Sequence, residues 1–147
     1  MDYRPLHLRS ILVPVDGSQA SLDALALSCS LARKTKNTIY AVYVIEVART
    51  MPLDAEMTAE AERGEQVLSR AERIAESLDY EVSGELLQAR DIGDAIVDEA
   101  VERGVSTIVL GVGHQETLAE FELGETAQYV LKNAPCQVML LRSAIEE

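Results

Sequence analysis

The sequence predicts an α/β fold, namely a doubly wound, five-stranded parallel sheet with helices on both faces. Short apolar or β-branched runs alternate along its 147 residues with segments of helical periodicity. This alternation is typical of right-handed βαβ units. The first run is almost continuously apolar, as a central strand buried on both faces should be. We therefore expect the strand order 3-2-1-4-5 and a single domain over residues 1–147.

The first strand is expected over residues 8–16, with Pro14 near its end, where a missing N–H is tolerated. Ser18 is a suitable N-cap for the helix that follows. One face of that helix carries the apolar side chains, which are Leu22, Leu25, Ala26, Cys29 and Ala32. The β-rich residues 38–47 form the second expected strand.

The middle of the chain begins with an expected loop over residues 49–54, which contains Pro52. Residues 55–78 form the longest expected helix, with a charged face that we interpret as solvated. Residues 81–89 are expected to form an outer strand, with Gly84 inside it. A further helix is capped by Asp91 and stopped by Gly104.

The last third of the chain contains two more expected strands, over residues 107–111 and 137–142. Residues 112–123 between them should form a loop with room for a short helical turn. A helix should begin at Glu125 and end before Pro135, which cannot continue it. Residues 143–147 form a short polar tail.

The net charge of −12 argues against several kinds of partner. Nucleic-acid binding needs a basic surface, and docking on an anionic membrane needs positive charge. No apolar run approaches the ~20 residues of a membrane helix. The first ten residues lack the apolar region of a secretory signal, so we expect a cytoplasmic protein. The two His and two Cys residues have no metal-ligand spacing, and no metal site is expected.

A ligand crevice is expected where the winding of the sheet reverses, between the first and fourth strands. Asp16 and Gly111 end these strands and should face each other across it. Gly124 precedes a helix whose free N–H groups and dipole favour an anion, which is the layout of a phosphate site. However, Glu125 places a carboxylate in the first turn of that helix. Two alternatives involve no ligand: Gly124 is a turn glycine and Asp16 a strand-end cap.

The chain resembles the universal stress protein family over nearly its whole length. The matching stretches are Ile11 to Ser18 (ILVPVDGS), Tyr43 to Glu46 (YVIE), Ile108 to Gly111 (IVLG), Gly124, and Asn133 to Arg142 (NAPCQVMLLR). The resemblance implies a cytoplasmic α/β protein that is usually dimeric. Some family members bind ATP and others do not. By position, it places Asp16 and Val44 against an adenine, and Leu110 and Gly111 beside the ribose.

The residues that should hold the phosphates depart from the family pattern of three glycines followed by Ser or Thr. His114 stands at the second glycine position, although Gly113 lies one residue earlier. An imidazole there either clashes with a phosphate or donates a hydrogen bond to it. Glu125 occupies the Ser/Thr position and repels a phosphate, and Thr126 follows with a hydroxyl. No Lys or Arg lies between residues 111 and 126.

These observations favour a non-enzymatic stress-response or regulatory protein whose nucleotide pocket is altered and holds ATP poorly. The alternative is a regulatory switch that binds ATP or AMP and hydrolyses ATP slowly at most. ATP with Mg²⁺ is the cofactor that the resemblance implies if a ligand binds. No catalytic set of Ser, His and Asp is evident, so we assign no catalytic residue. The physiological partner of such a regulator stays unknown.

The strand from Cys136 to Arg142 predicts a homodimer. It is apolar on both faces and should lie at an edge of the sheet. An exposed apolar edge tends to pair with another strand, and the resemblance implies pairing there across a two-fold axis.

Overall fold

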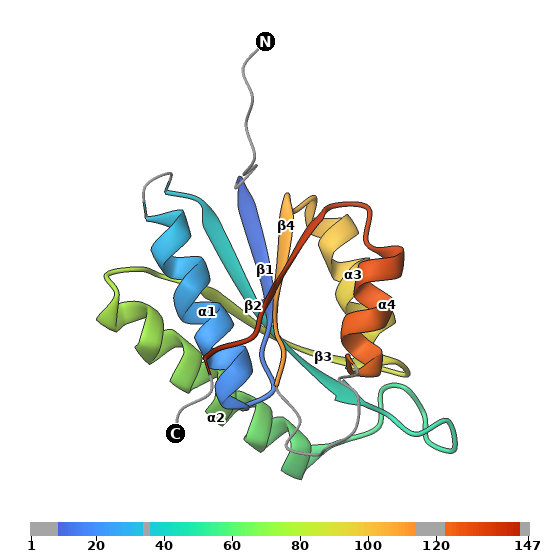
Figure 1. Cartoon of the computed structure of the whole chain (residues 1–147). Helices are drawn as coiled ribbons and strands as arrows, with labels where there is room; N and C mark the ends of the chain where they lie inside the picture. The colour runs from blue at the N-terminus through green and yellow to red at the C-terminus, as the bar shows by residue number, and fades with distance from the viewer. Residues whose placement is uncertain (1–8, 34–35, 114–122, 145–147) are drawn as a thin grey trace.

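The computed structural model describes residues 9–33, 36–113 and 123–144. Strands and helices alternate along the chain (Figure 1). The strands are β1 (Ser10–Pro14), β2 (Thr38–Glu46), β3 (Ser83–Ala89), β4 (Thr107–Gly111) and β5 (Gln137–Leu141). The helices are α1 (Gln19–Ala32), α2 (Thr58–Ser77), α3 (Ile92–Arg103) and α4 (Glu125–Asn133).

All five strands pair in parallel, in the order β3-β2-β1-β4-β5. This confirms the predicted fold class and strand order. The order reverses at β1, because the chain adds β2 and β3 on one side of it and β4 and β5 on the other. β1 and β4 share only two register pairs, Ile11 with Thr107 and Leu12 with Ile108. The two strands therefore separate toward their carboxyl ends, as the predicted crevice requires.

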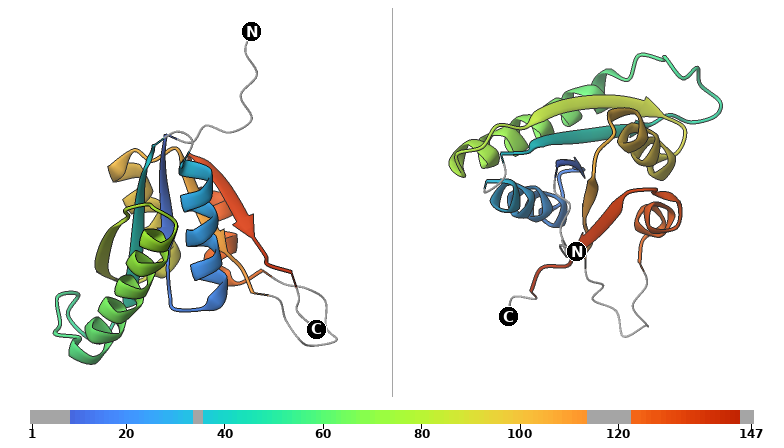
Figure 2. Two further views of the ribbon diagram at one scale, coloured as in Figure 1. Left: turned by 90° about the vertical axis from the view of Figure 1, so that its left-hand side faces the viewer. Right: turned by 90° about the horizontal axis from the view of Figure 1, so that it is seen from above.

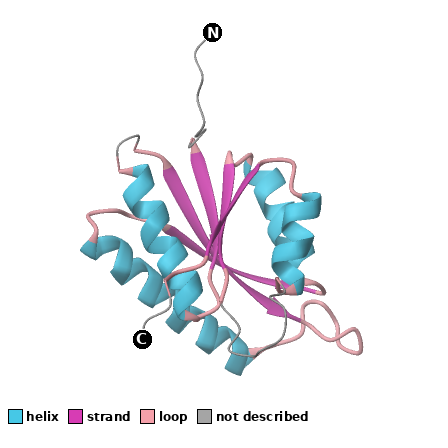
Figure 3. Ribbon diagram, in the orientation of Figure 1, coloured by secondary structure: helices cyan, strands magenta, loops and turns pink. Residues whose placement is uncertain are grey.

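The helices form two layers, with α1 and α2 on one face of the sheet and α3 and α4 on the other (Figures 2 and 3). Alternate residues of β1 contribute to the two cores, since Ile11 and Val13 face α1 and Leu12 faces α3. Among the described residues, no helix combines the length and apolarity needed to span a lipid bilayer.

Several predicted boundaries differ from the structure. The helix expected from residue 55 begins at Thr58, because the Gln88 side-chain amide donates to the carbonyls of Leu53 and Ala55, at 2.8 and 3.1 Å, and holds that segment in the preceding loop. β1 ends at Pro14, two residues early, since Asp16 already belongs to the turn before α1. β3 likewise begins at Ser83 rather than residue 81. The short helical turn considered for residues 112–123 falls mostly on residues 114–122, outside the described residues.

The predicted helix caps are present in part. The Ser18 side chain accepts a hydrogen bond from Ser21 N at 3.2 Å at the start of α1. Gly104 ends α3 in the left-handed conformation, with φ of 62°, which glycine adopts without steric cost. Asp91 occupies the N-cap position of α3, but its side chain makes no capping bond.

Gly111 is the point where β4 touches α1 backbone to backbone. A Cβ at this position would overlap the Ala20 carbonyl group and lie 2.8 Å from Ser21 N. Backbone atoms at the start of a helix cannot move aside as the end of a flexible side chain can. The fold itself therefore requires glycine at position 111, whatever binds beside it.

Replacement of Gly111 by Ala should destabilise the protein by about 2–4 kcal/mol, because the added methyl group forces β4 and α1 apart. Urea unfolding would measure the loss. Gly113→Ala is the matched control and should change the free energy of unfolding by less than about 0.5 kcal/mol, since no described atom lies within 4 Å of its Cβ position. Equal stability of the two variants would contradict the proposed close approach.

Candidate functional site

A crevice of about 410 Å³ lies at the carboxyl ends of β1, β2 and β4. Asp16 borders it after β1, Val44 on β2, and Gly111 at the end of β4. The amino-terminal ends of α3 and α4 contribute Ile92 and Gly124. Its volume falls within the roughly 300–1,000 Å³ of small-molecule pockets. The crevice thus occupies the place where doubly wound sheets bind ligands.

The floor of the crevice is apolar. Val42 and Leu110 come from the sheet, and Ile92 and Ile96 from α3. Asp16 has the one ionisable side chain among the described residues that line the crevice. An apolar slot with a single carboxylate at its edge suits a flat aromatic ring that carries a hydrogen-bond donor.

Asp16 is held as an ionised acceptor by the turn that follows it. Ser18 N donates to Asp16 Oδ1 at 2.9 Å, and Asp16 N donates to Ser21 Oγ at 3.2 Å. Partial burial acts to raise the pKa of Asp16. Hydrogen bonds from Ser18 and Ser21 outweigh it, so the pKa lies below its ordinary value. The carboxylate therefore stays charged at neutral pH, at the edge of the crevice.

The backbone of Val44 offers a donor and an acceptor on the same side of the crevice. Val15 N donates to Val42 O at 2.8 Å, so the Val42 carbonyl points toward the end of β1. Alternate residues of a strand direct their N–H and C=O groups to the same side. The N–H and C=O of Val44 thus point the same way, past the end of β1 and toward the crevice.

Of the three glycines around the crevice, Gly111, Gly113 and Gly124, packing requires only the first. Gly111 is required by its contact with Ala20. Gly124 has ordinary backbone angles, φ −61° and ψ 159°, which any residue can adopt. No described atom lies within 4 Å of the Cβ position of Gly124 or of Gly113. Neither backbone conformation nor packing among the described residues accounts for glycine at these two positions.

The amino-terminal end of α4 faces the crevice without a side-chain cap, since Gly124 has no side chain to supply one. Thr126 and Ala127 of its first turn line the crevice. Glu125 is not among the residues that line the crevice and instead lines a neighbouring hollow of about 420 Å³. Ile92 and Thr126 border both spaces, so the crevice and the hollow adjoin at the amino-terminal ends of α3 and α4.

The structure brings together seven of the nine residues that the sequence indicated, namely Asp16, Val44, Leu110, Gly111, Gly113, Gly124 and Thr126. Glu125 lies next to them, and His114 falls outside the described residues. Their role in binding a nucleotide stays a prediction. Sequence reasoning missed the apolar floor contributed by α3, although Ile92 and Ile96 stand one helical turn apart. Among the described residues, no group of three or more His, Cys, Asp or Glu side chains is placed to hold a metal ion.

A family model described as the universal stress protein family matches residues 7–142 of the chain. Universal stress protein MJ0531 of Methanocaldococcus jannaschii is 29% identical over 145 residues, which cover 95% of this chain and 85% of that protein.

Solved structures also resemble the chain. A universal stress protein family member from Burkholderia pseudomallei has a TM-score of 0.72 at 25% identity, covering 90% of this chain and 95% of that one. The Archaeoglobus fulgidus universal stress protein, solved in complex with dAMP, has a TM-score of 0.70 at 21% identity, covering 91% and 97%.

The lowered pKa of Asp16 predicts a specific pH dependence of stability. A carboxylate whose folded pKa lies below its unfolded value, about 3.9, stabilises the fold fully above that value. The stabilisation is lost as the pH falls through the folded pKa. We expect the stability advantage of the natural protein over Asp16→Asn to be constant near pH 6 and to shrink as the pH falls below about 4. Urea unfolding of both proteins between pH 6 and pH 2.5 would check it, and a pH-independent difference would contradict it.

Proposed function

The chain belongs to the universal stress protein family, and from this we propose that it is a non-enzymatic regulatory protein whose crevice binds an adenine nucleotide with one phosphate better than ATP. The observation that carries this proposal is Gly124. The φ of −61° does not require glycine at position 124, and no described atom lies within 4 Å of its Cβ position. A ligand that approaches the first turn of α4 closely would explain it.

The base-binding end of the crevice suits adenine. The exocyclic amine of adenine donates hydrogen bonds, which the Asp16 carboxylate and the Val44 carbonyl can accept. The adjacent ring nitrogen of adenine accepts one from the Val44 N–H. Guanine presents a carbonyl in place of the amine, and this carbonyl would face the Asp16 carboxylate without a proton between them. The arrangement therefore favours adenine over guanine.

The phosphate end of the crevice suits one phosphate better than three. The N–H groups at the start of α4 can hold the first phosphate, and the Thr126 hydroxyl lies within the same lining. The hollow lined by Glu125 adjoins this helix start, so further phosphates of ATP would come close to the Glu125 carboxylate. Like charges about 6 Å apart repel by about 0.7 kcal/mol in water and about 3 kcal/mol at an effective dielectric of about 20. A repulsion midway between these two values would lower the affinity for ATP about tenfold.

The relatives support an adenine nucleotide. The Archaeoglobus fulgidus universal stress protein was solved in complex with dAMP, which has an adenine base and a single phosphate. A second candidate function, an ATP-dependent switch, is favoured by Thr126, whose hydroxyl is placed one residue after the usual Ser or Thr and lines the crevice. Mg²⁺ would lower the repulsion that Glu125 exerts on a triphosphate.

A non-enzymatic role agrees with the residues that line the crevice. Asp16 is already engaged by Ser18, and the Ser21 hydroxyl beside it donates to the Ser18 carbonyl at 3.0 Å, so both groups are occupied in holding the turn before α1. The function we assign is therefore binding and regulation in the cytoplasm, with the bound nucleotide as the signal.

Homodimerisation through β5 is part of the same proposal. β5 pairs with β4 along one edge only and ends the sheet. Val138 packs toward α3 and α4, Met139 toward α1, and Leu140 is 37% exposed. An apolar strand with an unpaired edge suits pairing with the same strand of a second copy.

Calorimetric titration tests the ligand preference. We expect AMP to bind about tenfold more tightly than ATP without Mg²⁺, and Mg²⁺ to narrow the difference. Gly124→Thr should lower the AMP affinity at least about tenfold while leaving the free energy of unfolding within about 0.5 kcal/mol, because Thr is as good an N-cap as Gly. Equal affinities for ATP and AMP would contradict the proposed preference for AMP. Unchanged AMP affinity in Gly124→Thr would refute the placement of the phosphate.

Light scattering tests the dimer. The natural protein should have twice the chain mass of 16.1 kDa. Leu140→Glu should reduce it to the single-chain mass, because a carboxylate would be buried between the two edge strands. Val101→Glu is the matched control, since Val101 is 57% exposed on α3 and lies away from β5. Dissociation in both variants, or in neither, would contradict pairing through β5.

A further inference from the structure

The hydroxyl of Ser21 closes the gap that opens between β1 and β4 at the crevice. Val15 N donates to Val42 O at 2.8 Å, so the next N–H along the chain, that of Asp16, points away from β2. β1 and β4 share only two register pairs and separate beyond them. Ser21 Oγ accepts the Asp16 N–H at 3.2 Å. A side-chain hydroxyl of α1 thus takes the place of a carbonyl from the neighbouring strand.

Pro14 belongs to the same arrangement. Residues an even number of positions apart on a strand direct their backbone groups to the same side, so Ser10, Pro14 and Asp16 share the β4 side of β1. Ser10 N donates to Ser106 Oγ at 3.2 Å, just before β4. Pro14 has no N–H and needs no acceptor, which explains a proline at the end of a central strand. Serine hydroxyls thus hold this side of β1 at both of its ends.

The Ser21 hydroxyl is not needed to cap α1. The cap is Ser18, whose Oγ accepts the Ser21 N–H at 3.2 Å. Ser21 Oγ donates to Ser18 O at 3.0 Å, but this carbonyl also accepts the helical N–H of Leu22 at 3.2 Å. Ala forms helix better than Ser. What the hydroxyl contributes beyond the helix itself is its bond to Asp16 N.

Asp16 is therefore anchored at two points. Ser21 holds its backbone, and Ser18 N donates to Asp16 Oδ1 at 2.9 Å. Ser18 is exposed, whereas Ser21 is 4% exposed and lines the crevice together with Asp16. A buried hydroxyl has few water molecules to exchange partners with, so the backbone anchor is the firmer of the two. The place of the Asp16 carboxylate in the crevice depends on it.

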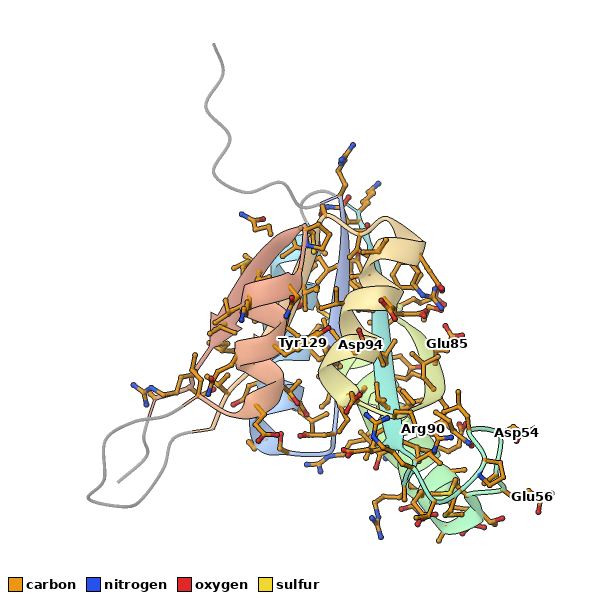
Figure 4. All side chains as sticks on the ribbon, turned by 90° about the vertical axis from the view of Figure 1, so that its right-hand side faces the viewer. Asp54, Glu56, Glu85, Arg90, Asp94 and Tyr129 are labelled. Carbon is orange, nitrogen blue, oxygen red and sulfur yellow. The ribbon has the colours of Figure 1, made fainter. Side chains whose placement is uncertain are left out.

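The opposite wall of the crevice is held by different residues. Figure 4 shows Asp94 on α3 beside Tyr129 on α4, and the Tyr129 hydroxyl donates to Asp94 Oδ1 at 3.0 Å. This bond joins the first turn of α3 to α4, whose first turn carries the N–H groups that we propose for the phosphate. A change at Ser21 should therefore act on the base-binding end and leave the phosphate-binding end in place.

We propose that Ser21 is the positioning residue that gives the crevice its preference for a 6-aminopurine. By accepting the Asp16 N–H, it fixes the Asp16 carboxylate where it meets the exocyclic amine of adenine. This inference rests on the proposed adenine-nucleotide function and adds the residue that sets its base selectivity.

The test uses two probes that differ in the exocyclic amine. The first is AMP, and the second is purine riboside 5′-monophosphate, which has hydrogen in place of the amine. Both carry the same ribose and phosphate, so the ratio of their affinities reports on the base-binding end. We expect the natural protein to bind AMP about tenfold more tightly in calorimetric titration, because the second probe leaves the Asp16 carboxylate without a donor.

Ser21→Ala should reduce this preference to about twofold. Ser21→Cys keeps the size of the side chain and supplies a much weaker acceptor, so it should have the same effect. Ser106→Ala is the matched control, because Ser106 Oγ accepts the Ser10 N–H and donates to Ser10 O at the other end of β1, outside the lining of the crevice. It removes the same kind of bond and should keep the tenfold preference. All titrations are made where urea unfolding shows each variant to be folded.

A double-mutant cycle tests whether Ser21 acts through Asp16. Asp16→Ala removes the carboxylate and should abolish the preference for AMP. Ser21→Ala added to Asp16→Ala should then change the ratio of affinities no further. A tenfold preference that survives in Ser21→Ala and Ser21→Cys, or an equal loss in Ser106→Ala, would overturn the inference.

The two titrations also separate this inference from the function beneath it. If AMP binds and the Ser21 variants keep its preference, the crevice binds adenine nucleotides and the role of Ser21 is wrong. If neither probe binds to the natural protein, the proposed function fails and this inference fails with it.

Discussion

The contact between β4 and α1 at Gly111 is the constraint on which the site depends. The backbone of Gly111 lies so close to Ala20 that no side chain fits between them. This contact fixes the end of β4 against the start of α1, and the start of α1 in turn holds Asp16 through Ser18 and Ser21. The two sides of the crevice are therefore positioned by one backbone contact, and the position of Asp16 is a property of the fold before any ligand binds.

The sequence was sufficient to predict the sheet because its signals are local and repeated. Apolar runs alternate with helical periodicity, and the run over residues 8–16 is typical of a central strand covered on both faces, where Ile11, Leu12 and Val13 are indeed fully buried. The boundary of α2 was not predictable in the same way. Its start depends on Gln88, a residue about thirty positions away, which binds the carbonyl of Ala55. Long-range side-chain contacts of this kind leave no periodic trace in the sequence.

The candidate site was predictable in membership but not in the roles of its members. Gly111, Gly113 and Gly124 look alike in the sequence, yet packing requires the first and accounts for neither of the others. The direction of Glu125 was equally hidden, because it depends on how α4 is rotated about its axis. That rotation is set by Ala127 and Val130, which are buried, and it places Glu125 in the lining of the neighbouring hollow rather than of the crevice.

The residues that build the fold and those to which we propose a role in ligand choice are consequently separate sets. Gly111, Ser18 and Ser21 hold the chain together, and their replacement acts first on stability. Gly124 and Glu125 are exposed, and Gly124 has no described atom near its Cβ position. Substitutions at these two positions change the charge and the accessibility of the amino-terminal end of α4 with little cost in folding free energy. Under the proposed function, the choice of ligand is thus set by a few exposed residues at the amino-terminal end of α4, on a scaffold whose stability depends on other residues.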